Sequence, residues 1–154
     1  LLDLLTIAED LDYQTRFDIS LLTHRLLVAT GWVRIHTPPA RRLPIGYFGA
    51  STGAAAALQA AAELDNHIKA VVSRGGRPDL AGEHYLDKVL SPTLLLVGSG
   101  VEEGLALNRK AYAQLSCTKE LSIIAGATHL FEEPGALEEV ARQAAIWFKL
   151  HLQH

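Results

Sequence analysis

The fold is decided by the stretch LPIGYFGASTGAAAA, residues 43–57. Its apolar first part predicts a short strand over residues 43–48, and the glycines that bound residues 49–53 predict a sharp turn. The alanines that follow predict a helix reaching about Leu64. A strand, a tight turn and a helix in this order are the unit of a parallel sheet, so we expect such a sheet with helices packed on it.

The same alternation continues on both sides of this stretch. Apolar runs predict three further strands, and helical spacing predicts three further helices. The strands are expected over 68–73, 93–97 and 121–125, and the helices from Ile19 to before Pro38, over 103–115 and from Pro134. The run 93–97 is continuously apolar, as in strands covered on both faces. We therefore predict an α/β fold: a doubly wound, mostly parallel sheet with helices on both faces.

The first eighteen residues carry a different pattern. Residues 1–5, LLDLL, predict the tail of a buried strand that begins upstream. Residues 6–18 are acidic without sustained periodicity and predict a surface loop. Because the chain contains no methionine, not even an initiator, we expect one domain over residues 1–154 that is incomplete at its N-terminus.

Composition excludes several classes of protein. With 154 residues, 20% charged residues and a net charge of −3, the chain suits one globular domain and does not suit a disordered tail or a polybasic nucleic-acid surface. No apolar run reaches the roughly 18 residues of a membrane helix. One cysteine, Cys117, excludes an internal disulfide and fits a reducing compartment. We expect a cytoplasmic protein without nucleic-acid or membrane partners.

The turn at residues 49–53 reads Gly-Ala-Ser-Thr-Gly. This is the pattern of a nucleophile elbow, in which a strained strand-to-helix turn lifts a serine hydroxyl above the carboxyl edge of a sheet. We expect Gly49 and Gly53 to be required because a side chain at either position would collide with the strand or helix beside it. Ser51 is the candidate nucleophile. The alternative is an ordinary serine in a glycine-rich turn that closes a strand.

A serine hydroxyl needs a base to accept its proton during attack. Among the seven histidines, His129 is the candidate, because it follows the last predicted strand at the edge where parallel sheets bind ligands. The alternative is a loop histidine that caps the last helix. No His-Glu-x-x-His pair and no phosphate-binding glycine fingerprint is present, so we expect no metal and no cofactor.

Four segments together resemble the alpha/beta-hydrolase superfamily, specifically its dienelactone-hydrolase-like branch. They are YFGASTG at 47–53, SRGGRPDL at 73–80, PTLLLVG at 92–98 and GATHLFE at 126–132. The resemblance covers nearly all of the chain and implies hydrolysis of a small ester or lactone through an acyl-enzyme, with Ser51 as nucleophile and His129 as base. The enzymes that give the branch its name carry cysteine at the elbow. The serine here therefore favours a serine esterase.

The residue that would orient His129 is less clear. The family usually places an aspartate a few residues after the strand over 93–97, where this chain has Val101. We expect Glu102 to substitute, followed by Asp79 or Glu103, and a chain without any such acid is a further option. As ordinary residues, the two glutamates would simply be first-turn acids of a helix, where they interact favourably with its dipole.

The resemblance also implies an oxyanion hole and a complete sheet. The backbone N–H of Thr52 is the candidate donor, and a second donor would come from a loop after the third strand of the family, which this chain lacks. Residues 1–5 would then be the fourth strand, leaving a gap beside the elbow strand. We expect an upstream segment or a strand from a second subunit, as in a homo-oligomer, to fill it.

Two arginines, Arg74 and Arg77, follow the second predicted strand and could hold a substrate carboxylate. Their alternatives are solvated loop charges or a pair with Asp79. The sequence thus predicts a serine hydrolase acting on a small-molecule ester or lactone. Its rival from another class is a relative that kept the fold, lost its acid and oxyanion loop, and serves as an interaction or scaffold domain.

Overall fold

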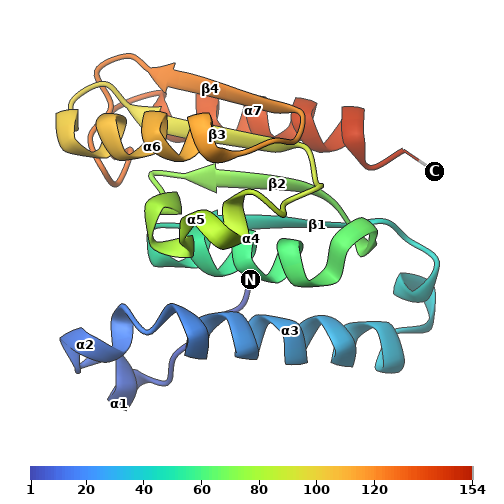
Figure 1. Ribbon diagram of the computed structural model, residues 1–154. Coiled ribbons are helices and arrows are strands. Elements are labelled where there is room, and N and C mark those ends of the chain that lie inside the picture. Colours follow the sequence, from blue (N-terminus) through green and yellow to red (C-terminus); the bar gives the residue numbers. More distant parts are fainter. Residues whose placement is uncertain (154) are drawn as a thin grey trace.

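The computed structural model describes residues 1–153, except for the side chain of Ala40. A four-stranded parallel sheet forms its centre, in the order β1-β2-β3-β4 (Figure 1). The strands are β1 (Ile45–Ala50), β2 (Ile68–Arg74), β3 (Thr93–Gly98) and β4 (Lys119–Ile124). This confirms the predicted fold class and all four of the predicted strands that lie after residue 42.

The register brings the ends of the strands to one level. Ala50 of β1 is paired with Arg74 of β2, and Arg74 is paired with Leu96 of β3. Because the strands are parallel, the residues that immediately follow them emerge at the same edge of the sheet. Ser51, the first residue after β1, therefore lies at the carboxyl edge.

Helices cover both faces of the sheet, as predicted. One face packs against α4 (Thr52–Leu64), α6 (Glu102–Gln114) and part of α3 (Ile19–His36). The other face packs against α7 (Ala136–His151). Successive residues of a strand point to opposite faces, so Val71 joins the first cluster and Val72 the second.

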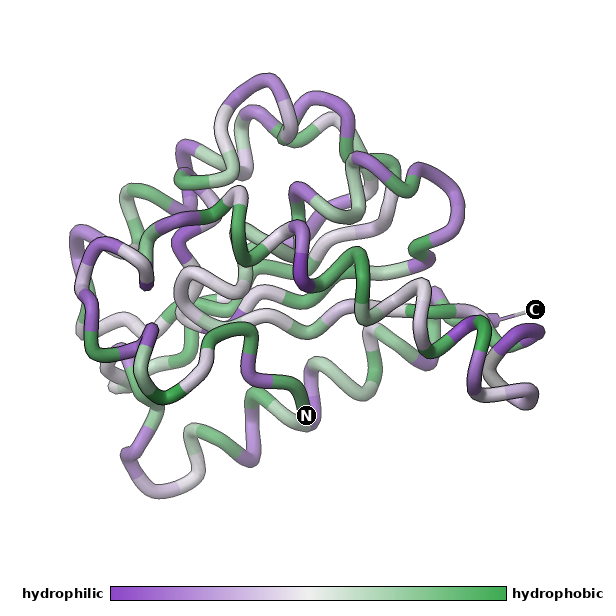
Figure 2. The backbone as a smooth tube through the Cα atoms, turned by 90° about the horizontal axis from the view of Figure 1, so that it is seen from below, coloured by the Kyte–Doolittle hydropathy of each residue, from purple (hydrophilic) through white to green (hydrophobic). Residues whose placement is uncertain are grey.

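The apolar strands are therefore enclosed from both sides. Leu95 and Leu96, one for each face, are fully buried, and each such side chain stabilises the fold by about 2 kcal/mol. The hydropathy colouring of Figure 2 places hydrophobic segments through the middle of the molecule and hydrophilic ones in its outer turns.

The helix after the elbow packs closely because its residues are small. Seven alanines of α4 are buried, and a buried glutamine on the same helix links three segments. Thr23 donates to Gln59 Oε1 at 2.8 Å, and Gln59 Nε2 donates to the carbonyl oxygen of Ala81 at 2.9 Å. Gln59 thus fastens α4 to α3 and to the short helix η3 (Pro78–Ala81).

The N-terminal prediction was wrong in two respects. Residues 1–5 form no strand, and Leu1 and Leu2 are exposed. Residues 6–18 contain two single-turn helices, α1 (Ile7–Asp10) and α2 (Tyr13–Arg16). The reason is local: Thr6 forms a capping box with Glu9 and Asp12 caps α2, so polar side chains satisfy the free N–H groups of each first turn.

Within residues 1–153 the sheet has no internal gap, and β1 is one of its edge strands. The strand expected at residues 1–5 would have lain beyond a missing neighbour, and its absence removes that arrangement. None of the helices in the described part of the chain has both the length and the apolar character needed to cross a membrane. The remaining elements are η1 (Pro38–Arg41), η2 (Asp65–His67) and α5 (Glu83–Leu86).

Candidate active site

Ser51 occupies a strained turn between β1 and α4. Its backbone has φ +51° and ψ −125°, a left-handed region that side-chain-bearing residues seldom adopt and that costs about 1–3 kcal/mol. Backbone hydrogen bonds hold it there: the N–H groups of Ala54 and Arg77 both donate to the Ser51 carbonyl oxygen at 3.1 Å. The hydroxyl makes no capping bond to α4. The turn therefore has the strained strand-to-helix geometry that the sequence predicted, with Ser51 at its tip.

The two glycines that flank Ser51 have different roles. A Cβ on Gly49 would lie 2.5 Å from the carbonyl oxygen of Gly53 and 2.7 Å from Cα of Ala54, so only glycine lets β1 and α4 approach this closely. A Cβ on Gly53 would meet no atom within 4 Å. The expectation that both glycines are sterically required was wrong for Gly53, because that position faces open space.

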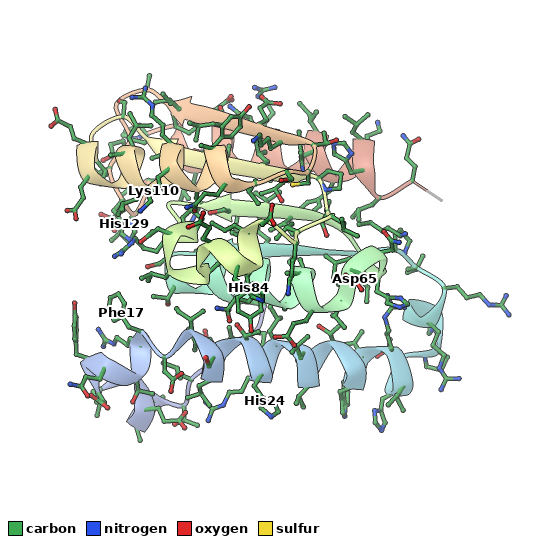
Figure 3. The ribbon with its side chains drawn as sticks, viewed as in Figure 1. Phe17, His24, Asp65, His84, Lys110 and His129 are labelled. Atoms are coloured by element: carbon green, nitrogen blue, oxygen red, sulfur yellow. The ribbon has the colours of Figure 1, made fainter. Side chains whose placement is uncertain are left out.

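His129 lies in the loop after β4, at the edge of the sheet where the strands end (Figure 3). A Cβ on Gly75, the residue after β2, would lie 2.9 Å from the His129 carbonyl oxygen and 3.6 Å from its Nδ1. The imidazole therefore lies close above Gly75, which has φ +50°. His24 and His84, also labelled in Figure 3, lie away from that edge.

The His129 loop is anchored at two points. Phe131 is fully buried with φ +58°, and the Thr128 N–H donates to the Glu133 carboxylate at 3.1 Å. The Thr128 hydroxyl donates to the same carboxylate, and these hydrogen bonds lower the pKa of Glu133. The loop is thus held on both sides of His129, while the imidazole is exposed and makes no side-chain hydrogen bond to any described residue.

The three candidate acids are placed differently. Asp79 accepts two hydrogen bonds from Arg77, at 3.0 and 2.9 Å, and this pairing raises the pKa of Arg77. Glu102 is an exposed residue at the start of α6. Glu103 lines the same pocket as His129.

That pocket has a volume of about 150 Å³ and lies between α6 and the loops that follow β2, β3 and β4. Six of its lining residues are Gly75, Arg77, Val101, Glu103, Asn108 and His129, and Ser51 does not line it. The pocket is therefore lined by both His129 and the start of α6, and Val101, at the position expected for an acid, is part of that lining. Asn108 is the residue that sequence reasoning missed. Its only signal is a polar residue on the buried stripe of α6, three residues before Ala111.

The remaining predicted positions are also at this edge. Thr52 is the first residue of α4, so its N–H has no intrahelical acceptor and is free to bind an anion. Of the two arginines proposed as a substrate clamp, Arg77 is paired with Asp79, the alternative that the sequence offered. The guanidinium of Arg74 lies over the Phe131 ring, 5.8 Å from its centroid. Among residues 1–153 no group of three metal-ligating side chains is present.

Proteins of known structure share this fold. A crystal structure of dienelactone hydrolase from Anabaena variabilis is 52% identical and superposes with a TM-score of 0.90, covering 98% of this chain and 71% of that one. A carboxyl esterase from Tuber melanosporum shares the fold at 14% identity and a TM-score of 0.67, over 86% of this chain and 63% of that one. No family model matches.

The fold is that of an alpha/beta hydrolase. This chain belongs to the dienelactone-hydrolase-like branch of that superfamily. Two curated proteins of Mycobacterium tuberculosis, each named "Putative phosphoribosyl transferase", are 53% identical over 152 residues. The match covers 99% of this chain but 34% of each relative, so the chain spans about a third of their length.

Proposed function

We propose that this chain is a serine hydrolase that cleaves a small ester or lactone through an acyl-enzyme. The observation that carries the proposal is the elbow: a serine at φ +51° between β1 and α4, at the edge where the His129 loop crosses Gly75. A strained turn of this kind persists only where the surrounding structure holds it, and such turns concentrate at active sites. Family membership adds to this, since the fold is that of hydrolases.

In the proposed reaction the Ser51 oxygen attacks the ester carbonyl while His129 accepts the hydroxyl proton. The Thr52 N–H donates to the oxyanion that forms. Collapse of this intermediate breaks the ester bond, and His129 returns the proton to the departing alcohol. Water then attacks the acyl-enzyme with His129 as base, releasing the acid and restoring Ser51.

None of the three other residues with nucleophilic or anion-binding chemistry, Cys117, Arg74 and Arg77, replaces Ser51 and His129 in this reaction. The Cys117 thiol is 3.8 Å from the Thr93 hydroxyl, and burial raises the thiol pKa, which disfavours the reactive thiolate. Arg77 is held by Asp79, so a substrate carboxylate would have to compete with that carboxylate. Arg74 is the better placed of the two arginines to assist binding.

Of the candidate acids, Glu103 fits the proposal better than Glu102 or Asp79, because it shares a pocket with His129 and Asp79 is engaged by Arg77. Its negative charge would stabilise the imidazolium that forms during attack. Glu103→Gln should therefore lower kcat more than Glu102→Gln. Equal rates in the two variants would remove Glu103 from the mechanism.

Hydrolysis of short-chain p-nitrophenyl esters tests the nucleophile. Ser51→Ala should reduce kcat to the uncatalysed background, a loss of about a thousandfold or more. Ser20→Ala, on the exposed face of α3, is the matched control and should keep the wild-type rate. Full activity of the Ser51→Ala protein would refute the proposal.

A second function, an interaction or scaffold domain, is favoured by Val101 at the acid position and by the unpaired outer edge of β1. We propose that this edge pairs with another strand. That strand comes either from a longer form of the same chain or from a second copy of the protein, which would make a cytoplasmic homo-oligomer. An inactive protein whose β1 amides on the side away from β2 are protected from hydrogen exchange would favour this function over catalysis.

The name of the mycobacterial relatives describes proteins about three times as long as the matched region. In this chain the glycine-rich turn holds a strained serine followed by alanines, and no lysine follows it to hold a phosphate. We therefore assign hydrolysis, and not phosphoribosyl transfer, to the region described by this structure.

A further inference from the structure

The segment of residues 75–77, which follows β2 at the carboxyl edge, meets both proposed catalytic residues. On one side, the Arg77 N–H donates to the Ser51 carbonyl oxygen at 3.1 Å. On the other side, a Cβ on Gly75 would lie 2.9 Å from the His129 carbonyl oxygen and 3.6 Å from its Nδ1. The segment therefore holds the elbow through a hydrogen bond and packs closely against the His129 loop.

Each residue of this segment is tied to a different element. The Gly75 N–H donates to the carbonyl oxygen of Leu96 in β3 at 2.8 Å, and Arg77 is tied to the elbow. Between them, the carbonyl oxygen of the buried Gly76 accepts a hydrogen bond from Asn108 Nδ2 of α6 at 3.1 Å. It is the one hydrogen bond to that carbonyl in the described part of the chain. The middle of the segment thus depends on a single side chain.

Gly76 also lies against the helix that begins at the elbow. A Cβ on Gly76 would overlap the Ser73 hydroxyl oxygen and lie 2.6 Å from Cβ of Ala54 in α4. Because such a close-packed contact leaves no space to absorb a shift, the position of Gly76 is coupled to that of α4. The hydrogen bond from Asn108 therefore acts on a point that is in contact with the elbow helix.

Asn108 occupies a buried position at which an apolar residue would be more favourable. Its side chain is 1% exposed, and its oxygen Oδ1 has no hydrogen-bond partner. A buried acceptor without a donor destabilises the fold, and a leucine of similar size would avoid this. The amide nitrogen, in contrast, is fully used: it donates to Gly76 and, at 2.8 Å, to the Gly104 carbonyl oxygen one turn earlier in α6. The bond to Gly76 is the one that reaches outside the helix.

We propose that Asn108 is a positioning residue for Ser51 and His129: its amide holds the Gly76 carbonyl and so fixes the segment 75–77 between them. This inference rests on the proposed function. Attack on an ester requires the hydroxyl and the imidazole to be correctly placed relative to each other, and a displacement of about 1 Å can lower the rate about a hundredfold. A segment in contact with both residues sets this placement, and Asn108 acts through it without touching a reacting atom.

The test compares Asn108→Leu with a matched variant, Ser91→Ala. The buried Ser91 hydroxyl donates to the carbonyl oxygen of Ile68 at 2.8 Å, so Ser91→Ala removes a bond of the same kind at the opposite end of β2. Asn108→Leu should lower kcat for ester hydrolysis at least about tenfold. KM should stay within about twofold, because the buried Asn108 offers a substrate almost no surface. Ser91→Ala should change neither quantity.

Hydrogen exchange measured by NMR adds a readout that does not need hydrolysis. The Arg77 amide should exchange at least about tenfold faster in Asn108→Leu than in the wild type, and at the wild-type rate in Ser91→Ala. Asn108→Thr is the second variant, since a threonine hydroxyl in a helix donates to the carbonyl four residues earlier, here Gly104, and leaves Gly76 without a donor. It should show the same loss of kcat and the same faster exchange.

Every result supports or overturns the proposal. Wild-type kcat in a folded Asn108 variant overturns it, as does an Arg77 amide that exchanges there at the wild-type rate. Equal losses in Ser91→Ala would show a general effect of stability and overturn it too. If neither Asn108 variant folds, the wild type still decides, because side-chain amide protons of Asn108 that exchange as fast as those of a free amide overturn the proposal.

The two proposals of this site fail in different ways. If the wild type hydrolyses no ester, but the Arg77 amide exchanges faster in the Asn108 variants alone, the hydrolase proposal fails and the hold of Asn108 on the segment stands. If the wild type hydrolyses esters and the Asn108 variants do so equally well, the positioning role fails and the hydrolase proposal stands.

Discussion

The elbow after β1 and the loop after β3 lie at the same edge of the sheet but are built in different ways. At the elbow, a steric contact at Gly49 and two backbone hydrogen bonds to the Ser51 carbonyl hold one strained residue in place. After β3, Val101 stands where an acid is expected. Ser51, the proposed nucleophile, is thus held by local backbone geometry, whereas the loop of His129, the proposed base, is held by the buried Phe131 side chain and by hydrogen bonds from Thr128 to Glu133.

The largest effect of a substitution is expected at the elbow itself. Gly49→Val should destabilise the protein by about 3 kcal/mol or more and abolish activity, because its side chain would meet the Gly53 carbonyl and Ala54. Gly53→Ala has open space and lies inside α4, so it should stabilise by up to about 1 kcal/mol. Urea unfolding measures both. Similar effects at the two positions would contradict the steric account.

His129, the proposed base, can also be displaced by a substitution at a neighbouring glycine. A side chain at Gly75 would meet the His129 carbonyl and Phe131, and φ there is +50°. Gly75→Ala should therefore cost about 2 kcal/mol of stability and lower kcat at least tenfold. Gly126→Ala also has a positive φ, +73°, but open space, so it should cost less and preserve kcat. Equal kcat losses would show that His129 does not depend on the approach to Gly75.

An acid introduced after β3 tests whether the lack of a carboxylate there limits kcat. Val101→Asp should raise kcat by about tenfold, because a carboxylate in the pocket stabilises the imidazolium during attack. Val101→Asn, without the charge, is the matched control and should not raise it. Initial rates of hydrolysis measured over a range of ester concentrations separate kcat from KM. If the aspartate does not raise kcat, the lack of an acid at position 101 does not limit catalysis.

The smallest expected effect is at the anchor of the His129 loop. Hydrogen bonds from Thr128 lower the pKa of Glu133 below its usual 4.5. A carboxyl group with a lowered pKa stabilises the folded loop above pH 4.5 and loses this contribution as the pH falls through the lowered pKa. The protection of residues 126–131 from hydrogen exchange, relative to the intrinsic rate at each pH, should fall in that acid range, and Glu133→Gln should remove the dependence. Glu132→Gln, at an exposed neighbour, should leave it in place.

The same division explains what could be predicted from the sequence. The strands and the helices α3, α4, α6 and α7 follow from apolar periodicity, and the elbow follows from glycines around one serine, all of which are local signals. The N-terminal strand was wrong because LLDLL is apolar but isolated, while the Thr6 and Asp12 caps act only through side-chain geometry. The place of Asn108 at the pocket was missed because it depends on contacts with Gly76 and Gly104 that are distant from any sequence motif.

The most direct test of the central claim is to treat the complete protein with a fluorophosphonate and identify the labelled residue by mass spectrometry. Such reagents phosphonylate an activated serine. We predict one covalent adduct, on Ser51, that is lost in both Ser51→Ala and His129→Gln and kept in Ser20→Ala. A folded wild-type protein that remains unlabelled, or that is labelled at another serine, would contradict the account.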